Sequence, residues 1–253
     1  MAIFSAYSNN EILDFLKKNA PHAEIHLDDE VAAKHAANGN AQTEIDGHIL
    51  AYIAVADVKD IRGVVKTATK FHLPIVPQGA DTSTVIGADG INDALILSTA
   101  RMDHIKEISK EDSVAVVEPG VINQTLDTAA REQGMFYAPD PASKPMSSIG
   151  GNVSTNAGGM SGVKYGATKD SVLGLKVMLE SGEEISLGGR TFKQAFGYDL
   201  TQLFVGSEGT LGIVTEITVK LFPQPLGKKI TGIAFSRIWR LWHAVLPTCA
   251  ILV

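Results

Sequence analysis

The spacing of apolar residues along the chain predicts an alternation of helices and strands. Residues 8–19 have apolar side chains at helical spacing and predict a short amphipathic helix. The uninterrupted apolar run 48–56 predicts a buried strand, and Asp57 is placed to cap a helix over 58–71. A second strand is expected at 73–76. The first part of the chain therefore predicts a strand–helix–strand unit.

The remaining pattern is dominated by strands and divides the chain into two lobes. Strands are expected at 94–98, 113–118, 171–179, 184–187 and within 206–223, and helices at 123–133 and 200–204. Residues 101–109 are expected to form a connector, and 192–198 a loop or a short helix. We therefore expect an N-terminal helical segment (1–47) and a domain at 48–225 with subdomains at about 48–110 and 111–225.

Large side chains are nearly absent between residues 139 and 166, where glycine, serine, threonine and asparagine dominate. Because glycine lacks a Cβ, such a backbone can lie directly against a large polar ligand and direct N–H groups at it. We therefore expect this stretch to wrap a dinucleotide. The loop 77–87 follows a predicted strand and is also rich in small and hydroxyl residues, which is typical of a pyrophosphate cradle or of an ordinary turn.

Composition narrows the possible partners. The formal net charge is −6 and no basic patch stands out, so nucleic acid is not expected as a partner. Cys249 is the only cysteine, which excludes an intrachain disulfide and fits a reducing compartment. The N-terminal residues do not form a signal-peptide pattern, and no apolar run is long enough for a membrane span. We expect a cytoplasmic protein, with peripheral membrane association left open.

Three early histidines raise the question of a metal site. His22, His26 and His35 match no usual zinc spacing, and no cysteine accompanies them. Surface histidines in a helix–loop segment are the preferred interpretation over metal ligation. We therefore expect no metal ion.

Five motifs in a fixed order carry a resemblance to a known family. They are VPQGADTSTVIG (76–87), VEPGV (117–121), DPASKPMSSIGGNVSTNAGG (140–159), YG (165–166) and GSEGTLGIVTE (206–216). Together they resemble the FAD-binding domain of the p-cresol methylhydroxylase (PCMH) and vanillyl-alcohol oxidase superfamily, and within it the FAD-linked 2-hydroxy-acid dehydrogenases. The resemblance implies an α+β fold of PCMH type, in which two α/β subdomains hold FAD between them.

The resemblance also implies which residues bind FAD. The pyrophosphate loop would contribute Val76, Pro77, Gln78, Gly79, Ala80, Asp81, Thr82, Ser83 and Gly87. The flavin and its ribityl-phosphate arm would be lined by Asp140, Pro141, Ala142, Ser148, Gly150, Gly151, Asn152, Asn156, Gly159, Gly166, Ile213 and Val214. Members with covalent flavin often use a histidine in this loop; Thr82 stands at that position, so noncovalent binding is expected.

Two positions depart from the family pattern. Gln78 stands where related proteins usually have arginine, and Asp81 where they usually have glycine. An aspartate beside a pyrophosphate would repel it unless the side chain points away. A Rossmann site is the alternative for the glycine-rich segments, but no G-x-G-x-x-G opens a helix after a strand.

The implied activity is oxidation of a D-2-hydroxy acid, such as D-lactate or glycolate, to the 2-oxo acid by hydride transfer to flavin N5. The electron acceptor is unidentified. No histidine falls in a flavin-lining motif, so the catalytic residues are unknown; Arg101 or Arg190 could meet an anionic substrate, although surface roles are favoured. One alternative is a flavin-binding fragment without turnover. Another is a reductase of the same fold, such as UDP-N-acetylenolpyruvoylglucosamine reductase.

Residues 226–253 differ from the rest of the chain in their residue types and in their pattern of apolar positions. Both tryptophans and the only cysteine fall here, and the pattern is neither cleanly helical nor strand-like. The segment is either an ordinary C-terminal helix or an atypical tail at the place where the family's substrate domain begins. We favour the second interpretation and expect a chain that is truncated relative to the family.

Overall fold

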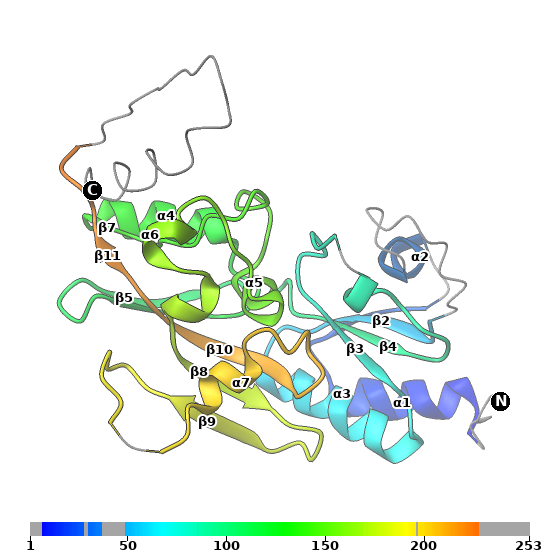
Figure 1. Ribbon diagram of the computed structural model, residues 1–253. Coiled ribbons are helices and arrows are strands. Elements are labelled where there is room, and N and C mark those ends of the chain that lie inside the picture. Colours follow the sequence, from blue (N-terminus) through cyan, green and yellow to red (C-terminus); the bar gives the residue numbers. More distant parts are fainter. Residues whose placement is uncertain (1–6, 28–29, 37–48, 85, 196, 228–253) are drawn as a thin grey trace, which may run out of the picture.

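A computed structural model describes residues 7–27, 30–36, 49–84, 86–195 and 197–227 (Figure 1). The described chain forms two lobes, each built on one β-sheet. His48 and the segment 228–253 lie outside the described residues, so the expectations for the tail stay untested. In the described part of the chain no helix is long and apolar enough to span a membrane.

The first lobe is a four-stranded sheet with helices on both faces. Its strands, in the order β1-β2-β4-β3, are β1 (Glu24–His26), β2 (Ala51–Ala54), β4 (Leu95–Ser98) and β3 (Ile75–Gln78). Its helices are α1 (Asn9–Asn19), α2 (Glu30–Ala36) and α3 (Val58–Phe71), followed by the short helix η1 (Ile86–Ala88). Strands β2, β3 and β4 are parallel, and β1 pairs with β2 antiparallel.

Alternation along β2 explains why both faces of this sheet are covered. Ala51 and Ile53 pack into the cluster shared with α1 and α3, whereas Tyr52 and Ala54 pack into a separate cluster with Ala32 of α2. Successive side chains of a strand point to opposite faces, so an all-apolar strand needs cover on both sides. The apolar run that predicted a buried strand is thus confirmed.

Helix α3 begins and ends where the sequence predicts. The Asp57 side chain accepts hydrogen bonds from the backbone N–H groups of Lys59 and Asp60, which satisfies the free donors of the first turn. The helix ends at His72, whose backbone is left-handed at φ 56°. Within the helix, Gly63 lies against the backbone of Asn19, so a side chain here would collide with the end of α1.

The second lobe is a five-stranded antiparallel sheet. Its strands, in the order β5-β6-β10-β8-β9, are β5 (Ile105–Ser109), β6 (Val114–Val117), β10 (Ile213–Lys220), β8 (Val172–Met178) and β9 (Glu184–Gly188). The other elements are α4 (Asn123–Glu132), α5 (Ile149–Thr155), α6 (Gly162–Tyr165), η2 (Thr168–Ser171), α7 (Leu200–Phe204) and the pair β7 (Met135–Phe136) with β11 (Phe222–Pro223). Helices α4 and α5 contribute Leu126, Ile149 and Val153 to its core.

Three expectations about elements need correction. Residues 105–109, expected as part of a connector, form β5, because they pair along β6 at the sheet edge. The short strand β1 was also missed, since its polar residues carry no strand pattern and only pairing with β2 reveals it. The small-residue stretch contains the helices α5 and α6, which the sequence did not predict.

The change from one sheet to the other falls before residue 105, rather than near 110, because β5 belongs to the second sheet. Elements of the N-terminal segment, α1, β1 and α2, pack with the first sheet rather than standing apart from it. The division of the chain into independent domains stays a prediction.

Candidate functional site

A cleft of about 530 Å³ lies where the two lobes meet. Volumes of roughly 300–1,000 Å³ are typical of small-molecule sites. The carboxyl end of β3 and the loop after it form one side, which we call the loop wall (77–84 and 86–88). Helix α5 and its flanks form the other, the helix wall (147–158); the amino end of β10 completes the cleft.

Most of the predicted cofactor residues line this cleft. They are Pro77, Gln78, Gly79, Ala80, Asp81, Thr82, Ser83, Gly87, Ala142, Ser148, Gly150, Gly151, Asn152, Asn156, Ile213 and Val214. The motifs at 76–87, 140–159 and 206–216 are far apart in sequence and meet here. That these residues contact FAD stays a prediction.

Five predicted residues lie outside the cleft lining: Val76, Asp140, Pro141, Gly159 and Gly166. Val76 packs in the core between the first sheet and α2. The Asp140 carboxylate accepts hydrogen bonds from Ser161 N (2.9 Å) and Oγ (2.7 Å), and Gly159 lies against the Asp140 backbone. Asp140 and Gly159 therefore shape the segment after α5 without lining the cleft.

The structure also adds residues that the sequence prediction omitted. They are Thr84, Ala88, Thr99, Pro119, Ser143, Ser147, Ser154, Thr155, Ala157, Gly158, Glu208, Gly209 and Gly212. Pro119 and Glu208 belong to the quoted motifs VEPGV and GSEGTLGIVTE, so the signal that could have found them was present. Thr99 has no such signal; its N–H donates to the Gln78 carbonyl (3.0 Å), which brings it to the cleft.

Ser148 joins the two walls. Its hydroxyl oxygen accepts hydrogen bonds from the N–H of Gly151 (3.2 Å) in α5 and of Ala80 (3.3 Å) in the loop wall. A Cβ on Gly79 would lie 2.5 Å from the same oxygen, so only glycine permits this close approach. Ser148 thus caps α5 and fixes the distance between the walls.

Gln78 faces away from the cleft with its side chain. The residue is buried, and its amide nitrogen donates to the carbonyls of His35 (3.2 Å) and Ala88 (3.3 Å). Its amide oxygen lies 3.1 Å from His35 Nδ1. Gln78 therefore organises the loop wall from behind and offers only backbone to a ligand.

The helix wall offers two unused polar groups. Ser147 Oγ and Asn152 Nδ2 are buried, line the cleft and have no hydrogen-bond partner among the described residues. A buried donor without a partner costs free energy, about 1–3 kcal/mol, which a polar ligand would recover. The Asn156 side chain differs, because its oxygen already accepts from Lys169 N (3.0 Å).

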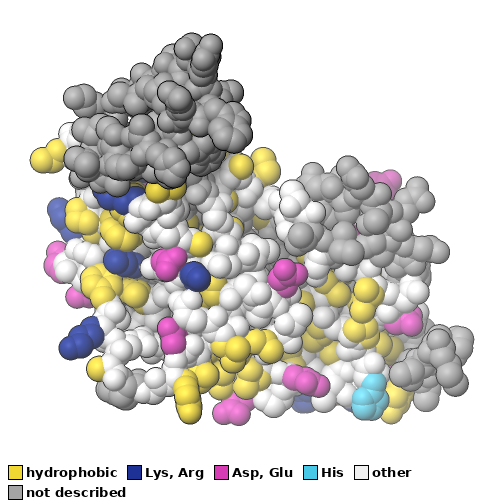
Figure 2. Space-filling model, in the orientation of Figure 1, with side chains coloured by type: hydrophobic (Ala, Val, Ile, Leu, Met, Phe, Trp, Pro, Cys, Tyr) yellow, Lys and Arg dark blue, Asp and Glu magenta, His cyan; other side chains and the backbone are white. Residues whose placement is uncertain are grey.

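The charges of the cleft are all acidic. Asp81 and Glu208 are the ionisable residues among its described lining, which includes no Lys, Arg or His. Burial raises the pKa of the Asp81 carboxyl, Asp89 raises it further and His35 lowers it. On the face shown in Figure 2, most basic side chains lie over the second lobe, away from the hollow between the lobes.

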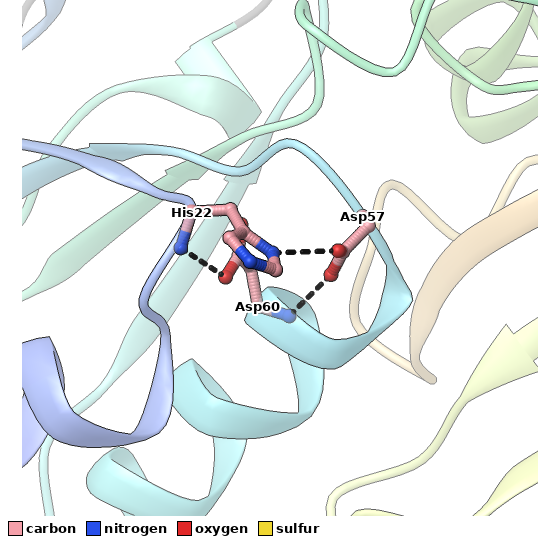
Figure 3. Close-up of side chains that lie close together, drawn as sticks. All are labelled: His22, Asp57 and Asp60. Carbon is pink, nitrogen blue, oxygen red and sulfur yellow. Dashed lines mark hydrogen bonds and ion pairs between the residues drawn. The ribbon is translucent and has the colours of Figure 1, made fainter.

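A cluster of His22, Asp57 and Asp60 lies outside this cleft (Figure 3). Its possible ligand atoms lie within 4.8 Å of one another, but the carboxylates are already engaged. Besides capping α3, Asp57 accepts from His22 Nδ1 (2.9 Å), and Asp60 accepts from the N–H groups of His22 (3.1 Å) and Ala56 (3.1 Å). These bonds attach the N-terminal segment to α3, which is a structural role.

Comparison with known proteins shows the family to which this chain belongs. A model of an FAD-binding domain family matches residues 49–188. The chain belongs to this family, and its cofactor is FAD. It is 42% identical over 203 residues to the glycolate oxidase subunit GlcD of Bacillus subtilis (strain 168), covering 80% of this chain and 43% of the relative. It is 40% identical over 190 residues to a D-lactate dehydrogenase of Anaerostipes hadrus, covering 75% and 38%. The FAD-domain chain thus spans about two-fifths of the length of these relatives.

Solved structures share the fold. A 4-ethylphenol oxidase from Gulosibacter chungangensis has a TM-score of 0.77 at 21% identity, covering 89% of this chain and 45% of the other. A p-cresol methylhydroxylase has a TM-score of 0.75 at 19% identity, covering 86% and 44%. The predicted α+β fold of PCMH type is therefore confirmed.

The residues of the cleft fit FAD. A Cβ at Gly79 would intrude on Ser148, where the two walls approach, and a Cβ at Gly150 would intrude on Pro119. Ser147 Oγ and Asn152 Nδ2 are buried polar atoms that have no partner among the described residues. Backbone N–H groups of the loop wall can meet phosphate oxygens without a cation. No histidine lies in the described lining to attach the flavin, in keeping with noncovalent binding.

Proposed function

We propose that this chain is the FAD-binding part of a dehydrogenase that oxidises a D-2-hydroxy acid, such as D-lactate or glycolate, to the 2-oxo acid. The observation that carries the proposal is that most of the residues predicted to bind FAD line one cleft, in a chain whose relatives are named for 2-hydroxy-acid substrates. Besides the glycolate oxidase subunit and the D-lactate dehydrogenase, they include a D-2-hydroxyglutarate dehydrogenase of Stutzerimonas stutzeri (strain A1501), 39% identical over 168 residues.

In this proposal the two walls divide the work of holding the cofactor. The backbone after β3, from Gly79 to Ser83, meets the pyrophosphate, and Ser147 and Asn152 of the helix wall bind the polar edge of the cofactor. FAD, when bound, supplies the hydride acceptor. The chain's own residues bind and orient it and exclude water from its buried side.

We assign no catalytic residue. Oxidation of a 2-hydroxy acid needs a base at the hydroxyl and a cation at the carboxylate, and no Lys, Arg or His is among the described lining residues. Arg101 donates to the His22 and Ala54 carbonyls and lies 3.5 Å from Glu24. Arg190 forms a bidentate pair with Glu107. Both arginines therefore have structural partners.

The lack of a Lys, Arg or His side chain among the described lining residues favours a second candidate function, that of a flavin-binding chain without turnover of its own. The two candidates share the cleft and differ in the substrate step. An electron acceptor is required by the first candidate and is unidentified.

The test is a visible spectrum of the purified chain after addition of FAD and removal of the excess. Retained flavin absorption supports FAD binding, and bleaching by D-lactate or glycolate under argon supports the dehydrogenase. Retention without bleaching favours the second candidate, provided that dithionite still bleaches the flavin. No retention at any protein concentration contradicts both. L-lactate serves as the matched substrate control.

A further inference from the structure

Asp81 is a carboxylate in the loop where the FAD pyrophosphate is expected. It directly follows Gly79 and Ala80 at the carboxyl end of β3 and lines the cleft. Its backbone is left-handed at φ 51°, a conformation that Gly, Asn and Asp accept best. Its Oδ1 atom is buried and has no hydrogen-bond partner among the described residues. The carboxylate therefore has an oxygen that the described fold does not use.

Within the described part of the chain, charged groups from three segments lie near the loop that carries Asp81. Asp89, 4% exposed, follows η1, and Glu208 reaches the loop from the opposite side, with its Oε2 2.8 Å from where a Gly87 Cβ would lie. His35 of α2 is the group that can carry a positive charge, and its ring is bound to Gln78 and stacked on Tyr52 with centroids 4.2 Å apart. Acidic groups therefore outnumber basic ones at this end of the cleft.

This arrangement is unusual for a pyrophosphate site. Phosphates carry full negative charges, and proteins usually meet them with cations or with backbone N–H groups. Here the N–H groups of the loop wall attract the pyrophosphate, while an ionised Asp81 repels it. Protonation of Asp81 removes the repulsion and leaves the attraction.

We propose that Asp81 couples FAD binding to a proton: the cleft holds the FAD pyrophosphate most tightly when Asp81 is protonated and releases it more readily when Asp81 ionises. This inference rests on the FAD binding proposed above and adds the way in which that binding depends on pH.

The direction follows from linkage. Asp81 already resists ionisation in the free cleft, because burial and then Asp89 raise its pKa, and two bound phosphate charges raise it further. Below both pKa values the carboxyl is neutral in the free and bound protein, so affinity is highest and constant. At pH values between the pKa of Asp81 in the free protein and its pKa in the FAD complex, binding takes up a proton, and the affinity for FAD falls as pH rises. Above both, affinity stays at its lower value.

The experiment measures the dissociation constant of FAD from about pH 4.5 to about pH 8 by quenching of flavin fluorescence. Asp81→Asn keeps the shape and the left-handed backbone and removes the charge. We expect it to tighten FAD binding about tenfold at neutral pH and to flatten the pH profile. Asp81→Gly, which also suits this backbone, is expected to act in the same direction.

Asp93→Asn is the matched control. Asp93 is also an aspartate with a left-handed backbone (φ 63°), but it is exposed and precedes β4, at the opposite end of the parallel strands from the cleft. The control is expected to leave the affinity and its pH profile unchanged. His35→Gln and Glu208→Gln test the neighbouring groups, because both could also contribute to the pH dependence.

Calorimetry in two buffers with different ionisation enthalpies gives a second measurement. Wild-type protein is expected to take up as much as about one proton per FAD in the sloping part of the profile, and Asp81→Asn none. Equal affinity and equal slope in wild type and Asp81→Asn overturn the inference while FAD binding stands. A slope that survives in Asp81→Asn and disappears in His35→Gln also overturns it. No binding at any pH by either protein overturns FAD binding and the inference together.

Discussion

The two walls of the cleft are built by different means. The helix wall is fixed by backbone packing: Gly150 donates to the Pro119 carbonyl (2.8 Å), and a Cβ on it would lie 2.6 Å from the Pro119 ring. The loop wall is fixed from behind by one polar side chain, Gln78. The helix wall is neutral and leaves no room for a side chain at Gly150, whereas the loop wall carries the charge of Asp81. We therefore expect a larger side chain to disrupt the helix wall, and loss of a polar side chain to disrupt the loop wall.

The largest effect is expected from Gly150→Val, which breaks the helix wall. The new side chain would collide with the Pro119 ring and backbone, and overpacking of this kind costs about 3 kcal/mol. We expect a lower melting temperature and loss of FAD retention. The matched control is Gly158→Ala, because Gly158 lines the same wall but a Cβ there meets nothing within 4 Å. Equal losses in both variants would refute the packing argument.

A smaller effect is expected from Asp127→Asn, behind the helix wall. The Asp127 side chain, 3% exposed, binds Lys144 (2.7 Å), Arg131 (3.0 Å) and the N–H of Tyr137 (3.1 Å). Lys144 lies in the segment that leads into α5, so this cluster supports the wall. Removing the charge from the buried, hydrogen-bonded group is expected to cost about 2 kcal/mol in the free energy of unfolding, measured in urea.

The pH dependence of the same carboxylate gives a further check. Burial would raise the pKa of Asp127, but the hydrogen bonds from Lys144 and Arg131 outweigh burial and lower it. A lowered folded-state pKa adds stability above the ordinary value of about 4, and that stability is lost as pH falls through the folded-state pKa. The wild type should therefore lose its advantage over Asp127→Asn on acidification. Glu132→Gln, an exposed change at the end of α4, should show no such difference.

The smallest effect is expected from Gln78→Leu, which loosens the loop wall. It leaves the His35 and Ala88 carbonyls without these partners and should cost about 1–2 kcal/mol. FAD affinity should fall more than stability, because the loop backbone loses its support. Gln124→Leu, an exposed glutamine of α4, is the control. If Gln78→Leu leaves FAD affinity unchanged, the loop wall does not depend on this side chain.

Much of the fold could be predicted because its signals are local. The apolar run of β2, the Asp57 cap and the alternation along β10 each specify their element within a few residues. Strands β1 and β5 could not be predicted in this way, since both are partly polar edge strands defined by their partners. Helix α5 was missed because glycine is a poor helix former, and here packing against Pro119 and β10 overrides that preference.

The sequence motifs predicted most of the residues that line the cleft, but not the directions of their side chains. The small residues of both walls line one cleft, as expected. Directions of side chains were not predictable: Gln78 turns away to bind His35, and Asp140 turns to Ser161. The motifs show that a residue belongs to a wall, but the direction of its side chain depends on a hydrogen-bond partner that is distant in sequence.

Two residues of the second lobe, Met178 and Ile213, complete the core of the first. The chain must therefore be synthesised for more than a hundred residues beyond β4 before that core can close. Until then, the part of this core that Met178 and Ile213 cover stays accessible to other chains, which is the state in which aggregation competes with folding. Yield from refolding should accordingly fall with protein concentration more steeply than the stability of the finished molecule would suggest.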